Sequence, residues 1–287
     1  MKHASSGRRH SKRARVRARR MTLLAAAALV VCVGAGFAIK QVLPTGGSTS
    51  TAAPGSSPAS SAASQPDAEA LAASAAAAEK AAKAAAAQAQ LDDPLMVLVS
   101  PVSPMPESYV VGDTVTCSTD VNNGTLAKVA GDAYKAMKEA AAADGITLHL
   151  QSGYRSVDYQ ANLFKKQIEK WKNTGLDEAA ATEKAKTVVT PPGCSEHNCG
   201  LAADINSPEY YPLEEPFKNT KAYAWLCAHA EEYGFILRYP QDKEEITGII
   251  YEPWHWRYVG VENAKAINAS GLCLEEYVAQ LKLDAAL

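Results

Sequence analysis

Residues 40–92 consist mostly of small and polar side chains, and this composition limits where the chain can bury a hydrophobic core. Residues 41–66 are rich in Gly, Ser, Thr and Pro, which is typical of a flexible linker. Residues 67–90 are rich in alanine, which has the highest intrinsic helix propensity, so we expect a helix there. Because this helix lacks large apolar side chains, we expect a stalk, with a short coiled coil as the alternative. The folded domain is therefore expected at 93–287, which is long enough to bury a core.

The N-terminal residues have the pattern of a membrane-targeting segment. Residues 1–20 contain many Lys and Arg residues and no acid, and residues 21–39 are uncharged and long enough to cross a bilayer core of ~30 Å as a helix. The positive-inside rule then predicts a cytoplasmic N-terminus and an extracytoplasmic domain. The alternative is a signal peptide cleaved near Gly36 and Ala38, which would release a secreted protein. Because the basic tail adjoins the apolar run, we expect it to lie at a membrane and not to bind nucleic acid.

Helix and strand patterns alternate at short intervals beyond residue 93. We expect helices at 125–145, 156–173, 177–186, 219–234, 261–268 and 274–283, and strands or extended segments at 94–101, 146–152, 200–205, 235–240 and 246–260. Thr125 can cap the first helix and Gly145 can end it. The strands are too closely spaced for a doubly wound sheet. The pattern predicts one α+β domain, with a small antiparallel sheet flanked by helices.

The segment CSEHNCGLAADI, residues 194–205, contains several side-chain types that bind zinc. His197 and Asp204 are seven residues apart, in a loop that enters a predicted strand. Taken alone, the segment fits a closed zinc site, a disulfide loop or one half of an open catalytic metal site. Its two cysteines, Cys194 and Cys199, leave this choice open.

A second segment, YEPWHWRYVG at residues 251–260, adds Glu252 and His255. Together the two segments offer two histidines and one carboxylate as ligands, with a glutamate to spare. Three protein ligands and an open position are typical of catalytic zinc, whereas structural zinc has four ligands and usually more thiolates. Zinc would activate water, and Glu252 would take its proton and pass it to the leaving amine.

A third segment, SGYRSVDYQANLF at residues 152–164, places Arg155 in a turn between a predicted strand and a predicted helix. A guanidinium fork at a rigid position suits bidentate binding of a carboxylate. Ser156 can cap the helix that follows. His149 and His229 are expected at the surface and not among the metal ligands, and the remaining histidines, His3 and His10, belong to the basic tail.

These segments, in this order, resemble the VanY-type D-alanyl-D-alanine carboxypeptidases, a zinc metallopeptidase family that includes VanX dipeptidases and LdcB-type L,D-carboxypeptidases. The family's metal motif is S-x-H-x-x-G-x-A-x-D, and residues 195–204 read SEHNCGLAAD. Its second motif is E-x-W-H followed by R-Y-V-G, and residues 252–260 read EPWHWRYVG. Its substrate motif is S-G-Y-R-S with a glutamine five residues after the arginine, and residues 152–156 read SGYRS ahead of Gln160. The resemblance covers about 93–287.

The resemblance implies one Zn²⁺ per domain and a role for each matching residue. The zinc ligands would be His197, Asp204 and His255. Glu252 would be the general base and acid, and Arg155 would stabilise the oxyanion or bind the substrate terminus. The other substrate-binding residues would be Ser195, Gln160 and Tyr239.

The implied substrate is the stem peptide of peptidoglycan, from which a terminal D-alanine would be removed. The alternatives are an L,D-carboxypeptidase acting on tetrapeptide stems and, from another class, a non-catalytic wall-binding module. The module is disfavoured because all three ligands and Glu252 are present.

The cysteines are expected to brace the fold rather than to bind zinc, because a thiolate in the fourth position would close the site to water. Disulfides persist outside the cytoplasm, and we expect Cys194–Cys199 and Cys227–Cys273 pairs. Cys117 then stays unpaired within the domain, and Cys32 lies in the apolar run.

Overall fold

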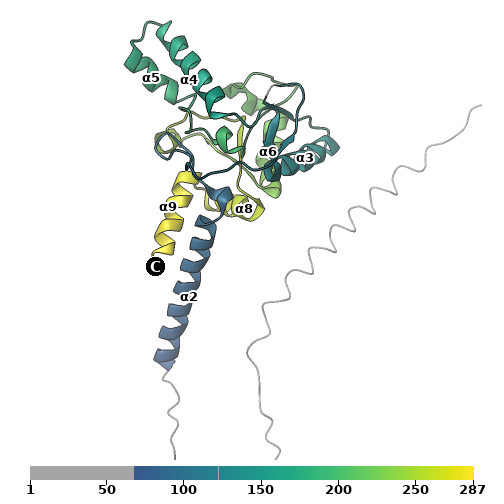
Figure 1. Ribbon diagram of the computed structural model, residues 1–287. Helices are drawn as coiled ribbons and strands as arrows, with labels where there is room; N and C mark the ends of the chain where they lie inside the picture. Colours follow the sequence, from purple (N-terminus) through teal and green to yellow (C-terminus); the bar gives the residue numbers. More distant parts are fainter. Residues whose placement is uncertain (1–67, 122) are drawn as a thin grey trace, which may run out of the picture. The chain divides into compact units, whose positions relative to one another are not determined.

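The computed structural model describes residues 68–121 and 123–287, and its most N-terminal element is the predicted alanine-rich helix. This helix, α2 (Ala68–Leu91), lies beside the C-terminal helix α9 (Leu274–Ala285) (Figure 1). Lys83 pairs with Asp284 at 2.9 Å, and Tyr277 donates a hydrogen bond to Gln90 at 2.8 Å. The first turns of α2 are exposed, but its last turns pack against the folded unit.

The expected basic tail (1–20), membrane anchor (21–39) and linker (41–66) lie outside the described residues. Within the described part of the chain, no helix combines the length and the hydropathy that crossing a bilayer requires.

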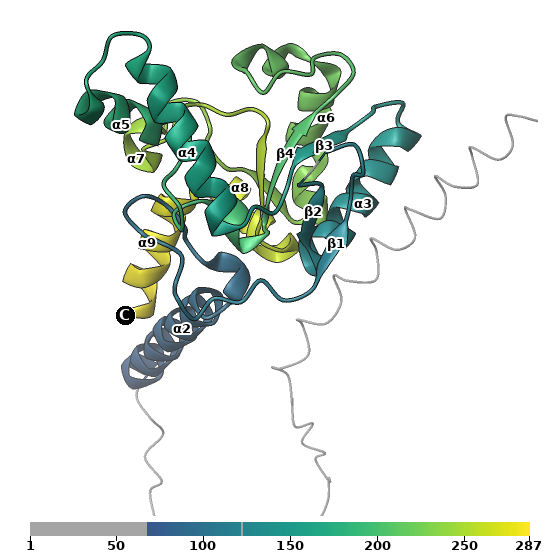
Figure 2. The same ribbon diagram turned by 45° about the horizontal axis from the view of Figure 1, so that its top comes forward.

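A four-stranded antiparallel sheet organises the domain, with strand order β3-β4-β6-β5. Its strands are β3 (His149–Ser152), β4 (Ala202–Asn206), β5 (Phe235–Leu237) and β6 (His255–Tyr258). A separate antiparallel pair joins β1 (Thr114–Thr116) to β2 (Thr125–Ala127). The expected α+β class with a small antiparallel sheet is confirmed (Figure 2).

The two faces of this sheet carry different kinds of side chain, because successive residues of a strand point to opposite faces. On one face, Ile205, Trp256 and Phe235 join the main hydrophobic core. Helices α3 (Lys128–Ala143) and α6 (Lys221–His229) supply buried side chains to the same core. The alternate positions of β4 and β6 include Asp204 and His255, so the polar residues share the other face.

The remaining helices surround the sheet. Helices α4 (Val157–Lys172) and α5 (Glu178–Lys186) pack together as a hairpin at the edge of the domain, and α8 (Val261–Ser270) and α9 enclose a second apolar cluster. The shorter helical segments are η1 (Pro94–Met96), η2 (Glu196–Cys199), η3 (Glu215–Asn219), η4 (Ala230–Tyr233) and α7 (Glu244–Thr247).

Several predicted boundaries were wrong. Thr125 does not cap α3: it pairs with Thr116 in the β1–β2 ladder, and α3 begins at Lys128 without a side-chain cap. The segment 94–101, predicted as a strand or an extended segment, begins instead with η1, where Asp93 accepts a hydrogen bond from the backbone of Leu95. The predicted strand at 246–260 is reduced to β6, because α7 takes up its first residues and Gly248 ends that helix with φ 73°.

A candidate metal and catalytic site

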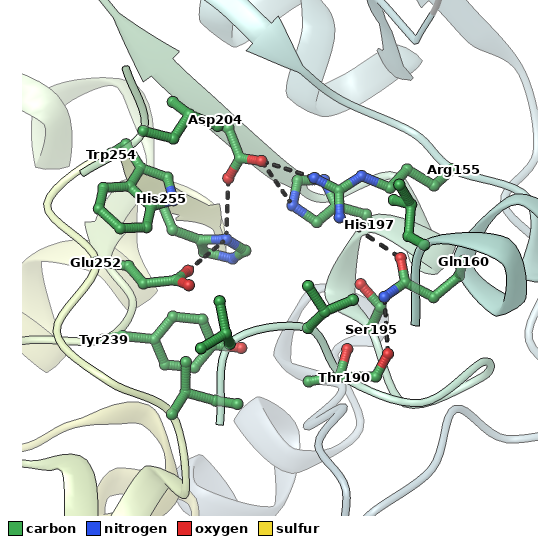
Figure 3. A pocket seen from close by; sticks show the side chains of 15 residues that line it. Arg155, Gln160, Thr190, Ser195, His197, Asp204, Tyr239, Glu252, Trp254 and His255 are labelled. Carbon is green, nitrogen blue, oxygen red and sulfur yellow. Dashed lines mark hydrogen bonds and ion pairs between the residues drawn. The ribbon is translucent and has the colours of Figure 1, made fainter. Parts of the chain in front are cut away.

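Two neighbouring strands and the turn before them bring His197, Asp204 and His255 together. Asp204 in β4 and His255 in β6 are register partners, and His197 lies in η2, which Gly200 ends in a left-handed conformation (φ 73°). One potential ligand atom from each residue lies within 4.8 Å of the others, and all three side chains are buried. Figure 3 shows the Asp204 carboxylate between the two imidazole rings.

Each histidine turns one ring nitrogen toward Asp204 and the other toward an oxygen acceptor. Nδ1 of His197 donates to the carbonyl oxygen of Gly153 at 2.7 Å, so Nε2 faces Asp204 Oδ2 at 3.2 Å. Nδ1 of His255 lies 3.1 Å from Asp204 Oδ1, and its Nε2 lies 3.4 Å from Glu196 Oε2. The atoms that can hold a cation are therefore Nε2 of His197, Nδ1 of His255 and a carboxylate oxygen of Asp204.

These atoms fit a zinc ion. Oδ1 of Asp204 is buried and has no hydrogen-bond partner among the described residues, and Nδ1 of His255 lies 3.1 Å from it as an ion-pair contact. A buried acceptor without a donor is the kind of group that a cation satisfies. Two imidazoles and one carboxylate, with a position left for water, are also the donor set of catalytic zinc.

The site shifts the pKa of each of these residues. Burial, together with the positive charge of Arg155, lowers the pKa of His197 to about 4. Burial also acts to lower the pKa of His255, but the carboxylates of Asp204 and Glu196 raise it to about 9. Burial opposes ionisation of Asp204, yet His197 and His255 hold its pKa well below its usual range. Because a cation must displace the proton from Nδ1 of His255, metal binding here releases a proton.

Glu252 lies beside the three candidate metal ligands. Its Oε2 lies 3.6 Å from Nδ1 of His255, and its backbone nitrogen donates to the carbonyl oxygen of Tyr239 at 3.2 Å. Burial raises the pKa of Glu252 to about 8, against the opposite effect of His255. A carboxyl group with a pKa near the working pH is suited to both accept and return a proton.

Arg155 is bound directly to the metal-ligand cluster. Its NH2 group donates to Asp204 Oδ2 at 2.8 Å, its Nε donates to Ser152 at 3.0 Å, and its backbone nitrogen donates to the carbonyl oxygen of His197 at 3.0 Å. Ser156 caps α4 as expected, accepting a hydrogen bond from Tyr159 at 3.2 Å. The end of β3 and the start of α4 thus hold the Arg155 guanidinium at the rim of the cluster.

The three other predicted substrate-binding residues line the same pocket as the metal ligands, Glu252 and Arg155. This pocket has a volume of about 280 Å³, and apolar side chains form much of the rest of its wall: Leu163, Val188, Val189, Leu213, Ile249 and Trp254. Ser195 and Tyr239 lie on its wall, and the Tyr239 ring is 4.8 Å from the His255 ring. Gln160 also lines the pocket, and its Nε2 donates to the carbonyl oxygen of Thr190 at 2.8 Å. It therefore ties the 188–190 segment to α4 and keeps its Oε1 toward Arg155 at 3.5 Å.

The predicted disulfides are wrong for this structure: all five cysteines among the described residues are free. Cys199 is packed in the main core, and its thiol donates to the carbonyl oxygen of Glu196 at 2.9 Å. Cys273 is at the N-cap of α9 and takes part in a capping box with Glu276, whereas Cys227 is exposed on α6. Cys199 and Cys273 thus make local contacts and no disulfide.

The two described histidines that the sequence placed outside the site, His149 and His229, lie outside it. The His149 ring packs 5.8 Å from the ring of Tyr211, and His229 pairs with Glu232 at 3.0 Å. Sequence reasoning missed Glu196, whose carboxylate faces His255. The position of Glu196 directly before His197 was the available signal, but its partners lie far along the chain.

Comparisons with known proteins identify the family of the domain. The chain matches the family model described as VanY, D-alanyl-D-alanine carboxypeptidase, over residues 123–261. It is 38% identical over 184 residues to the D-alanyl-D-alanine carboxypeptidase of Enterococcus faecalis, a match that covers 64% of this chain and 65% of that protein. The chain therefore spans just under two thirds of that relative's length.

Two solved structures are similar to the domain. One is a variant of the vancomycin-resistance D,D-pentapeptidase VanY from a VanB-type resistance cassette, in complex with Zn(II); it is 38% identical with a TM-score of 0.56, and the match covers 64% of this chain and 98% of that chain. The other is the LdcB LD-carboxypeptidase, which is 38% identical with a TM-score of 0.58, and the match covers 64% of this chain and 86% of that chain.

Proposed function

Because the chain belongs to the VanY family of D-alanyl-D-alanine carboxypeptidases, we propose that it removes the C-terminal D-alanine from peptidoglycan stem peptides. One observation carries the proposal: the Glu252 carboxylate lies 3.6 Å from Nδ1 of His255, beside the two-histidine, one-aspartate cluster. A proton acceptor next to an open metal site is the arrangement that zinc-dependent peptide hydrolysis uses.

Each residue of the site would have its own role in the reaction. His197, Asp204 and His255 hold the zinc ion, which when bound supplies Lewis acidity to the scissile carbonyl and to the attacking water. Glu252 takes one proton from that water as oxygen bonds to the carbonyl carbon. It then returns the proton to the amine of the departing D-alanine as the C–N bond breaks.

Arg155 supplies positive charge at the same rim of the pocket. Its guanidinium can stabilise the oxygen on which negative charge develops, or it can bind the terminal carboxylate of the stem. The apolar side chains that line the rest of the pocket suit a small side chain such as the methyl group of D-alanine. Trp254 and Ile249 are two of these apolar side chains.

Mass spectrometry of stem peptides incubated with the purified protein tests this function. We expect the pentapeptide to lose one alanine and the tetrapeptide to stay intact. The alternative is L,D-carboxypeptidase activity, favoured by the similarity to the LdcB LD-carboxypeptidase, and it predicts shortening of the tetrapeptide. Failure to shorten either stem in the presence of zinc would contradict both functions.

We also propose that residues 21–39, which lie outside the described residues, anchor the protein in the membrane with the domain on the extracytoplasmic side. The uncharged run and the basic residues before it support this location. Cell fractionation, combined with protease treatment of intact spheroplasts, tests it. Protease-sensitive protein in the membrane fraction is expected, and release into the medium after cleavage would support the secreted alternative.

A further inference from the structure

We propose that Glu196 is a positioning residue, which holds the His255 ring so that Nδ1 is presented to zinc. Glu196 and His255 are 59 residues apart in the sequence, yet Oε2 of Glu196 lies 3.4 Å from Nε2 of His255. Both side chains are buried. The inference rests on the zinc site of the proposed function but not on the identity of the substrate.

Two arginines fix the Glu196 carboxylate. Oε1 of Glu196 accepts hydrogen bonds from Nε of Arg238 and from NH1 of Arg257, each at 2.7 Å. Neither guanidinium is exposed to solvent. Charge-assisted hydrogen bonds of this kind are short and directional. They keep Oε1 on the arginines and leave Oε2 to face the histidine.

The arginines are themselves held by other parts of the fold. Arg238 forms a two-pronged ion pair with Glu275 of α9, at 2.8 and 2.6 Å. Arg257 donates from NH2 to the carbonyl oxygens of Leu95 and Val97, at 2.9 and 2.8 Å. The orientation of Glu196 therefore depends on the C-terminal helix and on the segment that follows α2.

An ionised carboxylate accepts hydrogen bonds and donates none. The ring nitrogen that faces Glu196 must therefore carry a proton, and in a neutral imidazole this leaves the lone pair on Nδ1. The other histidine ligand is arranged in the same way, since Nδ1 of His197 donates to the carbonyl oxygen of Gly153 at 2.7 Å. An acceptor on the non-ligating nitrogen is the usual device that sets the tautomer of a metal-binding histidine.

If Glu196 only held the arginines in place, removing its charge would weaken zinc binding no more than removing the charge of another glutamate that pairs with Arg238. Glu275 is that glutamate, and it provides the matched control. Both glutamates pair with Arg238, but the described contacts of Glu275 do not include His255. In Glu196→Gln, the amide oxygen can stay on the arginines, which turns the amide nitrogen toward His255. That nitrogen donates a hydrogen bond, so it favours a proton on Nδ1 and opposes metal binding.

The test measures zinc affinity, by competition with a chromophoric chelator at fixed pH and ionic strength, in the full-length wild-type protein and both variants. We expect Glu196→Gln to weaken zinc binding by roughly 10- to 100-fold and Glu275→Gln to change it by less than about threefold. Equal weakening in the two variants, or affinity within about threefold of wild type in Glu196→Gln, overturns the proposal. Thermal melting after chelation shows whether each variant is folded.

A second measurement does not depend on any variant. In the zinc-loaded wild-type protein with ¹⁵N-labelled histidine, long-range ¹H–¹⁵N spectra report which ring nitrogen carries the proton. We expect the proton of His255 on Nε2 and zinc on Nδ1, and the reverse pattern overturns the proposal. Zinc affinity and tautomer are read without turnover. If both agree with the proposal but no stem is cleaved, the proposed function fails and this inference stands.

Discussion

Asp204 and His255 are directly opposite each other in the antiparallel β4–β6 ladder, and Asp204 Oδ1 lies 3.1 Å from Nδ1 of His255. Residues paired across a ladder have side chains on the same face of the sheet, with Cβ atoms about 5 Å apart. Backbone hydrogen bonds, and not a flexible loop, therefore set the spacing of two of the three metal ligands. The third ligand, His197, reaches them from the turn that leads into β4.

Asp204→Asn should abolish high-affinity zinc binding. The variant keeps the shape of the side chain but removes the negative charge that faces both histidines and Arg155. Since loss of an outer-shell partner typically costs about 10- to 100-fold in affinity, loss of a ligand charge should cost more. Chelator competition measures this, with Asp132→Asn on the exposed surface of α3 as the control. Equal zinc affinity in Asp204→Asn and wild type would show that the metal binds elsewhere.

Glu252→Gln should stabilise the chelator-treated protein, and more strongly at pH 8 than at pH 5. Burial raises the pKa of Glu252 from 4.5 to about 8 in the folded state. The protonated Glu252 carboxyl contributes its full stability below the pKa that this group has in the unfolded chain. That contribution is lost as the pH rises through the pKa of Glu252 in the folded protein. Glutamine avoids this loss, which is on the order of a few kcal/mol.

Denaturant unfolding at a series of pH values measures the difference between Glu252→Gln and the wild type. The Glu245→Gln variant, at an exposed position of α7, provides the control. A pH-independent difference for Glu252→Gln would mean that the carboxyl titrates normally.

Arg155→Lys should lower kcat/KM by roughly 100-fold or more while zinc stays bound, because lysine has no planar fork. Stems that end in an amide instead of a carboxylate separate the two roles of Arg155. If Arg155 binds the terminal carboxylate, the wild type loses activity on the amide and Arg155→Lys loses little more. If Arg155 stabilises the oxyanion, the two losses multiply. Wild-type kinetics in Arg155→Lys would exclude both roles.

The cysteines of the domain should be found as free thiols. Alkylation of the denatured, unreduced protein, followed by peptide mapping, should modify Cys194 and Cys199 completely. Addition of a reductant before alkylation should change nothing for these two, nor for Cys227 and Cys273. Alkylation that requires reduction would restore the disulfide prediction made from the sequence.

The sequence predicted most of the local structure because local rules govern it. Ser156 caps α4, and the left-handed Gly145 follows α3, as turn and capping chemistry requires. Thr125 was misassigned because its role depends on pairing with Thr116, which no local pattern reveals. The alternation in β4 was hidden because both faces of that strand are buried.

The motifs identified the residues that the structure brings together, namely the three candidate ligands with Glu252 and Arg155, but not the contacts that orient them. Glu196 is adjacent to His197 in the sequence, but the arginines that bind it are 42 and 61 residues away. Gln160 matched a substrate-binding motif, but the motif did not predict the hydrogen bond from its amide to the carbonyl oxygen of Thr190. Such contacts form only when distant segments fold together, so one sequence read by spacing does not contain them.

The most direct test of the zinc mechanism is the release of D-alanine from a pentapeptide stem before chelation, after chelation and after zinc is returned. Release should stop on chelation and resume with zinc. After zinc is restored, Glu252→Gln should bind the metal. It should release D-alanine at least about 100-fold more slowly than the wild type, because the proton acceptor is gone. Release that survives chelation, or a wild-type rate in Glu252→Gln, would contradict the mechanism.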